Sequence, residues 1–225
     1  MPLDTAIIVS VYNEADLLPD TLAALEEAFP GARVVVADDG STDASGHVAL
    51  QAGVELVRSP RVVGKGGAAT LAAEHVLADG GSGIVVLCDG DLGASARELP
   101  ALAAAVSAGE CDLAIAAFAR RVGGGFGFAV GFSRWATREL GGLELSAPIS
   151  GQRALRAEVL PLLIPFAPRF GMETAMNIDA ARAGLRVQQV ELDLEHRATG
   201  RTLAGFLHRA RQLADFVAVY LGRRR

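Results

Sequence analysis

Short apolar runs rich in β-branched residues alternate with longer amphipathic stretches over the first 120 residues. The apolar runs predict strands at residues 5–11, 33–37, 54–58, 83–88 and 112–118. The stretches between them predict helices at residues 15–29, 44–52, 65–78 and 96–108. Because the strands are continuously apolar rather than alternating, they suit a parallel sheet that is buried on both faces. We therefore predict an α/β fold: a doubly wound, mostly parallel sheet with right-handed crossovers and helices on both faces.

The pattern changes after residue 118, where a glycine-rich patch begins. Beyond it we predict helices at residues 132–140 and 174–183, and strands at residues 148–155 and 186–194. A long amphipathic helix is predicted at residues 203–221, with apolar residues repeating at helical spacing. Since no linker or repeat interrupts the chain, we predict a single domain over residues 1–225, with halves at 1–120 and 121–225.

Composition narrows the class of protein. Hydrophobic residues make up 51% of the 225 residues, which is enough for a substantial core. The net charge of −5 argues against a nucleic-acid binder. The absence of a basic leader and of an apolar stretch of about 18 residues predicts a cytoplasmic protein. Cys88 and Cys111 fall in apolar runs, so we interpret them as core residues rather than as a disulfide.

A polar segment follows each of the first four predicted strands, at the carboxyl edge of the sheet. In an open parallel sheet, ligands bind beyond the carboxyl ends of the strands. The segments are residues 12–14, 38–43, 64–67 and 89–91. One such segment is explained by turn chemistry, but four at the same edge indicate a binding site.

The sharpest of these segments is Asp89-Gly90-Asp91. Two carboxylates two residues apart, at the end of a buried strand, can both face one cation. Hard oxygen ligands suit Mg²⁺ or Mn²⁺, which usually also bind diphosphate oxygens. The alternative is an ordinary Asp-Gly turn.

Two other segments predict contacts with a nucleotide. Asp38 and Asp39 are interpreted as partners of a nucleobase and ribose, although Ser41 or Thr42 in the same segment also suit a helix cap. Lys65 lies in Gly64-Lys65-Gly66-Gly67, which lacks P-loop spacing but places a lysine and backbone N–H groups at a helix start. A solvated lysine in a flexible loop is the alternative. No G-x-G-x-x-G follows the first strand, which argues against a dinucleotide-binding dehydrogenase.

The order and spacing of these segments resemble the family 2 glycosyltransferases with the GT-A fold. The resemblance implies a UDP- or GDP-sugar donor, bound by residues 1–120, and a divalent metal at the Asp-x-Asp. It makes Asp91 a direct metal ligand of catalytic importance, places Asp89 on ribose or metal, and places Asp39 on the base. It also assigns to the donor site Val11, Asn13 and Glu14.

The second half resembles polyprenyl-phosphate glycosyltransferases and glucosyl-3-phosphoglycerate synthases around residues 150–154, 171–174 and 196–197. In the latter a late histidine joins the metal, which implies that His196 is a ligand; a surface histidine is the alternative. Gln152 and Arg153 are expected to hold acceptor or leaving phosphate. Glu173 is expected to act as a general base, although a carboxylate at a helix start also suits the helix dipole. The chain lacks Gln-x-x-Arg-Trp, which argues against a processive polysaccharide synthase.

We therefore expect a metal-dependent glycosyltransferase acting on an acceptor hydroxyl or phosphate, in a lipid phosphate or a small phosphorylated acid. One rival is a sugar-nucleotide nucleotidyltransferase, which would carry a glycine- and arginine-rich loop in place of residues 12–14. The other is a non-catalytic nucleotide-binding regulator, which the intact Asp89 and Asp91 disfavour. The oligomeric state is left open, a homo-oligomer included.

Arginines crowd the C-terminal end, at positions 201, 209, 211 and 223–225. Two interpretations remain: a solvated basic face, or peripheral contact with anionic lipid at the inner face of a membrane.

Overall fold

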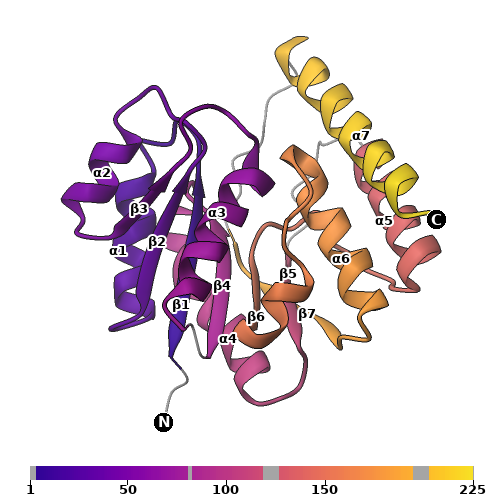
Figure 1. Cartoon of the computed structure of the whole chain (residues 1–225), viewed down its shortest axis with the longest axis horizontal. Helices are drawn as coiled ribbons and strands as arrows, with labels where there is room; N and C mark the ends of the chain where they lie inside the picture. The colour runs from indigo at the N-terminus through magenta and orange to yellow at the C-terminus, as the bar shows by residue number, and fades with distance from the viewer. Residues whose placement is uncertain (1–3, 81–82, 119–126, 195–202, 225) are drawn as a thin grey trace.

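The computed structural model describes residues 4–80, 83–118, 127–194 and 203–224, whose strands form one seven-stranded sheet (Figure 1). The strand order is β3-β2-β1-β4-β6-β5-β7. The bounds are β1 (Thr5–Val11), β2 (Arg33–Asp38), β3 (Glu55–Arg58), β4 (Ile84–Asp89), β5 (Leu113–Phe118), β6 (Arg153–Arg156) and β7 (Val187–Leu192). Only β6 is antiparallel to its neighbours, so the sheet is mostly parallel, as predicted.

Helices cover both faces of this sheet. The α-helices are α1 (Leu18–Ala28), α2 (Ser45–Gln51), α3 (Lys65–Ala78), α4 (Pro100–Ser107), α5 (Gly127–Gly141), α6 (Met172–Arg182) and α7 (Leu203–Arg223). Short 3₁₀ helices lie at Gly93–Glu98 (η1), Ala157–Leu162 (η2) and Arg169–Gly171 (η3). No helix in the described ranges is long and apolar enough to cross a membrane.

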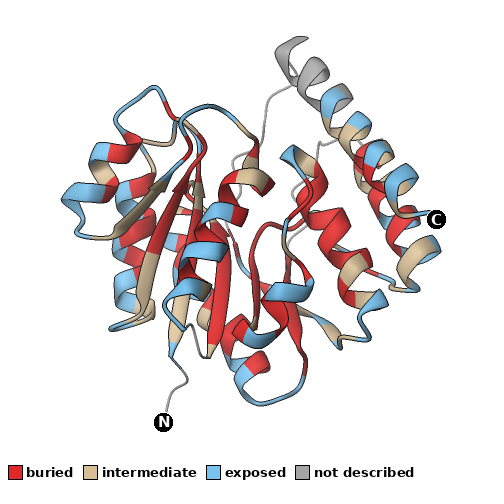
Figure 2. Ribbon diagram, viewed as in Figure 1, coloured by how far each residue is buried: buried red, intermediate tan, exposed pale blue. Residues whose placement is uncertain are grey.

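Two hydrophobic cores lie on opposite faces of the sheet, because side chains alternate along each strand. In β1, Ile7 and Val9 pack into the core shared with α1 and α4, whereas Ile8 packs into the core shared with α3 and α6. The central strands are buried along most of their length (Figure 2). Each fully buried aliphatic side chain contributes about 1.5–3 kcal/mol, so the two cores fix the positions of the strand ends.

Helices α5, α6 and α7 pack against one another at the end of the molecule beyond β5 and β7 (Figure 1). Ala175 and Ile178 of α6 form a small core with Val219 of α7. The buried hydroxyls of Ser133 on α5 and Thr174 on α6 hydrogen bond at 2.7 Å. The three helices therefore form a layer whose inner member, α6, carries Glu173.

Most predicted elements are confirmed, and the differences have local causes. The strand at 5–11 and the helix at 65–78 match to the residue. The helix predicted at 96–108 is split into η1 and α4, because Pro100 lacks an N–H and begins a new helix. The strand predicted at 148–155 was wrong in extent: β6 begins at Arg153. Both cysteines are buried free thiols, as predicted.

Candidate functional site

The polar segments gather at the carboxyl edge of the sheet, as predicted. Val11 of β1 lies opposite Asp38 of β2, and Ser10 lies opposite Asp89 of β4. Because these three strands are parallel and end level with one another, the segments that follow them emerge side by side. Asp89 is the last residue of β4. Asp91, which is partly buried, follows it after a single glycine.

Only glycine fits between the two aspartates. A Cβ on Gly90 would lie 2.9 Å from Val11 Cγ2, and the Gly90 N–H donates to the Ser10 carbonyl at 2.9 Å. The backbone of Gly90 therefore packs closely against β1, and the carboxylates of Asp89 and Asp91 remain at the carboxyl edge of the sheet.

The reversed strand β6 brings a further segment to this edge. Arg153 pairs with Leu87 of β4, so the residues before Arg153 lie past the end of β4, beside Asp89. The Gln152 amide donates to Asp89 Oδ2 at 2.8 Å. A Cβ on Gly151 would lie 2.5 Å from both Asp89 Oδ2 and Lys65 Nζ. Gly151 therefore belongs to the site, although the sequence pattern alone gave it no role.

A cation between two carboxylates forms the centre of the site. Lys65 Nζ lies 2.6 Å from Asp89 Oδ1 and 2.7 Å from Glu173 Oε1. The Lys65, Asp89 and Glu173 side chains are 22%, 28% and 8% exposed. Burial alone would lower the pKa of Lys65, but the two carboxylates outweigh it and raise that pKa above its ordinary value. The lysine therefore stays charged at neutral pH.

The starts of α3 and α6 approach closely enough to make this contact because of two glycines. Gly64 has a φ of +87°, and its absent Cβ would lie within 3 Å of Arg169. A Cβ on Gly66 would lie 1.9 Å from the Ala167 carbonyl oxygen. Any larger residue at these positions would separate Lys65 from Glu173.

Asp39 fixes the loop that leads into α3. Its Oδ1 accepts from the Val63 N–H at 2.7 Å and from the Gly64 N–H at 2.9 Å. Burial raises the pKa of Asp39, and these two hydrogen bonds oppose the rise. The carboxylate is 6% exposed and lies at the edge near Lys65, where contact with a base stays a prediction.

Asp38 has a different place from the one that we expected. It is 0% exposed, and its Oδ1 accepts from the Ser41 N–H at 2.8 Å. Its Oδ2 lies 3.4 Å from Arg58 Nε without hydrogen-bonding geometry. The expected contact with base or ribose is therefore corrected: Asp38 holds the turn after β2.

The segment after β1 is joined to this turn. Asn13 has a φ of +55°, and its Oδ1 accepts from the Thr42 N–H at 2.8 Å. The Glu14 N–H donates to Ser45 Oγ at 2.9 Å, and the carbonyl of the buried Val11 accepts from the Asp39 N–H at 2.9 Å. These contacts shape the edge, and direct donor contact by Val11, Asn13 or Glu14 stays a prediction.

The burial of Arg153 corrects another expectation. Its guanidinium is 0% exposed and donates to the Ser150 carbonyl at 2.9 Å, Asn177 Oδ1 at 2.8 Å and the Glu173 carbonyl at 3.3 Å. Burial lowers its pKa to about 10, although the nearby Glu173 and Asp89 oppose this. Arg153 thus joins the start of β6 to the first turn of α6 instead of facing a phosphate.

The predicted third metal ligand, His196, lies outside the described residues. Within residues 4–80, 83–118, 127–194 and 211–224, no three His, Cys, Asp or Glu side chains form a ready-made metal cluster. Its role as a ligand therefore stays a prediction.

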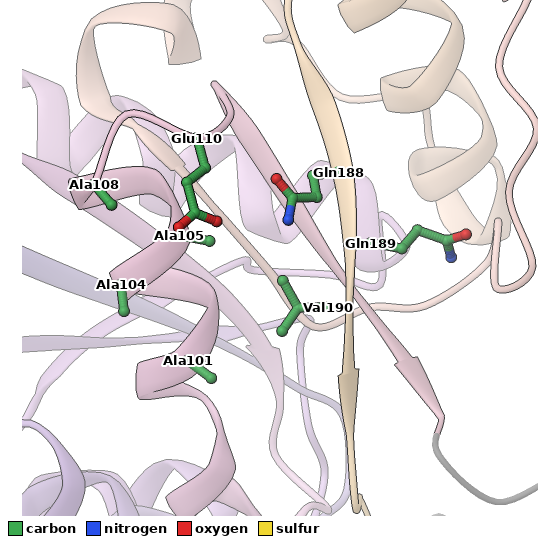
Figure 3. Close-up of a pocket in the computed structure, with 8 residues that line it drawn as sticks. All are labelled: Ala101, Ala104, Ala105, Ala108, Glu110, Gln188, Gln189 and Val190. Carbon is green, nitrogen blue, oxygen red and sulfur yellow. The ribbon is translucent and has the colours of Figure 1, made fainter.

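A hollow of about 460 Å³ lies elsewhere, against the edge strand β7 (Figure 3). Its lining is Ala101, Ala104, Ala105, Ala108, Glu110, Gln188, Gln189 and Val190. With one carboxylate and no cation, this lining does not suit a nucleotide diphosphate.

Asp89 at the end of β4, Lys65 at the start of α3 and Glu173 at the start of α6 lie on a fold shared with nucleotide-sugar glycosyltransferases of the GT-A class. The family model of glycosyl transferase family 2 matches residues 6–154, and the chain belongs to that family. This confirms the resemblance and sets aside the nucleotidyltransferase and the non-catalytic regulator.

The chain is 31% identical over 211 residues to an undecaprenyl-phosphate mannosyltransferase of Micrococcus luteus, across 87% of this chain and 85% of the relative. It is 25% identical to glucosyl-3-phosphoglycerate synthase of Mycobacterium tuberculosis solved with Mn²⁺, UDP and phosphoglyceric acid, with a TM-score of 0.80. That match covers 98% of this chain and 78% of the other. The same enzyme with Mn²⁺, UDP and glucosyl-3-phosphoglycerate gives a TM-score of 0.79 at 25% identity, covering 98% and 79%.

Proposed function

We propose that this protein transfers a sugar from a UDP- or GDP-sugar to the phosphate of a lipid-phosphate acceptor, using Mg²⁺ or Mn²⁺. The observation that carries the proposal is the ammonium of Lys65 between Asp89 and Glu173 at the carboxyl edge of the sheet. The relative from Micrococcus luteus supports the lipid phosphate, and the solved relatives with UDP and Mn²⁺ support the donor and the metal.

The residues at the edge fit a divalent cation. Asp89 and Asp91 supply hard carboxylate oxygens, and Asp89 already holds one cation, the Lys65 ammonium, at 2.6 Å. The missing side chain of Gly151 leaves room beside Asp89 Oδ2, which the Lys65 ammonium also approaches. Diphosphate oxygens and His196 would complete the ligands. A bound divalent ion would offset the charge that develops on the departing diphosphate.

The chain's own residues orient and stabilise the reactants. Lys65, which is charged at neutral pH, would move from Asp89 to a diphosphate oxygen when donor enters. Gln152 holds Asp89 in its orientation through the 2.8 Å hydrogen bond. Asp39, which anchors the loop before α3, is the residue that we propose for the base.

A small phosphorylated acid reacting through a hydroxyl is the second candidate acceptor, because the Glu173 carboxylate, 2.7 Å from Lys65 Nζ, would serve there as the general base. The two acceptors make different demands on this carboxylate. A phosphate monoester has a second pKa of about 6. The phosphate oxygen that attacks the sugar is therefore already ionised at neutral pH, and no base is needed to remove a proton from it. A hydroxyl keeps its proton at neutral pH, and general base catalysis contributes about 10²- to 10⁴-fold there. The solved synthase with phosphoglyceric acid supports this alternative.

The test is a turnover assay with UDP- and GDP-sugars, with and without Mn²⁺, on a short polyprenyl phosphate and on phosphoglyceric acid. We expect metal-dependent transfer to the polyprenyl phosphate and at least about 10²-fold loss in Asp91→Ala, since the metal-dependent step loses its ligand. Near-normal turnover in a folded Asp91→Ala protein would refute the metal assignment. Glu173→Gln then decides between acceptors: a loss within about tenfold agrees with phosphate, and a loss of about 10²- to 10⁴-fold agrees with hydroxyl.

A further inference from the structure

Three aromatic side chains cluster on the outer side of α5 and α7. The Trp135 ring lies 4.8 Å from Tyr220 and 5.4 Å from Phe132, and Phe132 lies 6.1 Å from Tyr220, centre to centre. Trp135 is 38% exposed, and Leu221, next to Tyr220 on α7, is 50% exposed. We call this cluster, with Leu221, the aromatic face. Within this face Trp135 and Leu221 are exposed to solvent, whereas Phe132 and Tyr220 are partly buried.

The exposed charges on the same two helices are mostly positive, although the whole chain carries −5. Among the side chains described in residues 129–141 and 211–224, the exposed charged ones are Arg134, Arg138, Arg211, Arg224 and Glu139. Arg224 lies one helical turn after Tyr220, and Arg138 lies one turn after Trp135. Arginine therefore flanks the aromatic face on both helices.

Hydrogen bonds join the helices of this face to α6, which carries Glu173. Ser133 of α5 hydrogen bonds to Thr174, the neighbour of Glu173. Arg223 of α7 forms two hydrogen bonds with Asp179 of α6, at 2.7 and 2.6 Å. Because Arg223 is held in this way, it is not one of the arginines available outside, contrary to the basic-tail interpretation of the sequence.

We propose that the aromatic face, with its flanking arginines, rests on the surface of an anionic lipid bilayer. Tryptophan and tyrosine favour the membrane–water interface, where the ring is buried and the polar tip stays wet. Arginines beside them complement anionic headgroups. A second copy of the chain does not fit, because a twofold contact would set one group of arginines against another. The proposal rests on the proposed function in one respect: a lipid-phosphate acceptor is held in such a surface.

Trp135 makes the test direct, because it is the only tryptophan in the chain. The intact protein is mixed with vesicles of equal parts phosphatidylglycerol and phosphatidylcholine, and with vesicles of phosphatidylcholine alone. We expect co-sedimentation and a blue-shifted, lipid-quenchable tryptophan emission with the anionic vesicles at low salt. High salt should reverse both effects through screening. Co-sedimentation without a change in tryptophan emission would overturn the proposal, since another face would then be bound.

Substitutions on and off the aromatic face test whether it is the surface that binds the vesicles. Arg138→Glu combined with Arg224→Glu should weaken vesicle binding by more than about tenfold, because each arginine near such a surface contributes about fivefold. Leu221→Ser should weaken it too, whereas Leu162→Ser, a matched change at a residue 59% exposed elsewhere, should not. Equal binding by Leu221→Ser and Leu162→Ser would overturn the proposal, as would a dimer in solution that shields Trp135 from a soluble quencher.

Hydrolysis of the nucleotide sugar in the absence of acceptor separates this inference from the proposed function. The Arg138→Glu, Arg224→Glu protein should hydrolyse donor at the wild-type rate, because neither residue touches the site. Vesicle binding by a protein that hydrolyses no donor would refute the function and leave the membrane face standing. Donor turnover by a protein that ignores anionic vesicles at low salt would refute the membrane face alone.

Discussion

Replacing Gly151 by alanine is the most discriminating single change that the geometry offers. The new Cβ would lie 2.5 Å from Asp89 Oδ2 and 2.5 Å from Lys65 Nζ, against 3.4 Å for ordinary contact. Both atoms are the ends of side chains, so they must retreat by about 0.9 Å while the backbone stays in place. Overpacking of this kind typically costs about 1–3 kcal/mol of stability, which leaves a folded protein.

The effect on catalysis should be larger than the effect on folding. The displaced atoms belong to the carboxylate proposed to bind the metal and to the lysine proposed to bind the diphosphate. A misplacement of about 1 Å in a catalytic group costs on the order of 10²-fold in rate. We therefore expect Gly151→Ala to lower kcat by about 10²-fold and to raise the Mn²⁺ concentration needed for half-maximal activity.

The assay is steady-state turnover of a UDP- or GDP-sugar across a Mn²⁺ titration, with thermal unfolding measured on the same samples. Gly131→Ala is the matched control, because a Cβ at this α5 position meets nothing within 4 Å. It should leave kcat unchanged and stabilise the helix slightly. A folded Gly151→Ala protein with kcat within twofold of wild type would refute the placement of Asp89 and Lys65 in the catalytic site.

Two further predictions concern the binding of the nucleobase by Asp39 and the stability of the folded protein at acidic pH. Asp39→Asn keeps an oxygen for the Val63 and Gly64 N–H groups but removes the charge, so it should weaken metal-free UDP or GDP binding by about 10- to 150-fold, equivalent to about 1.5–3 kcal/mol; unchanged affinity by calorimetry would leave Asp39 only its loop-anchoring role. Hydrogen bonds from Arg33 hold the pKa of Glu55 at about 2, against an ordinary 4.5, so its contribution is present above pH 4.5 and is lost as the pH falls toward 2. Because the Glu55 side chain is 42% exposed, Glu55→Gln should lower the free energy of unfolding by only about 1 kcal/mol at pH 7. Urea unfolding measures the difference in this free energy between wild type and variant, and an equal difference at pH 7 and pH 3 would contradict the prediction.

The helices and strands that were predicted best are those whose bounds are marked by the residues within them and directly beside them in the sequence. The strand at 5–11 was predicted to the residue because the polar segment Tyr12-Asn13-Glu14 ends its apolar run, and the helix at 65–78 because Gly64 marks its start. The gathering of the polar segments at one edge followed from strand–helix alternation, since parallel strands share a carboxyl edge. Asp89 and Lys65 were placed together in this way, although the 2.6 Å ion pair between them was not foreseen.

The two neighbouring aspartates show what the pattern could have revealed. Successive side chains of a strand point to opposite faces of the sheet. Asp38 accordingly points toward α2, where its carboxylate would touch a Cβ on Gly46 at 3.5 Å, whereas Asp39 points toward the start of α3. Both were assigned to the donor from their residue type and their place after the second strand, and Asp39 also from the family resemblance. Because side chains alternate along a strand, the sequence could have predicted that only one of the two aspartates faces the site and that the other stabilises the turn.

Strand β6 shows what no local pattern could reveal. Its four residues, Arg-Ala-Leu-Arg, carry no sign of direction, since direction depends on which strands lie on either side. Reversal places residues 150–153 beside Asp89; a parallel strand would have placed them at the opposite edge. Reversal also explains why an arginine lies in the core, where an unpaired charge is costly. Arg153 finds carbonyl and amide oxygens only because the start of β6 lies beside the first turn of α6, and through the Glu173 carbonyl it fixes the helix turn that carries the proposed base. Its contribution to catalysis is therefore positional, and it exists only in the folded chain.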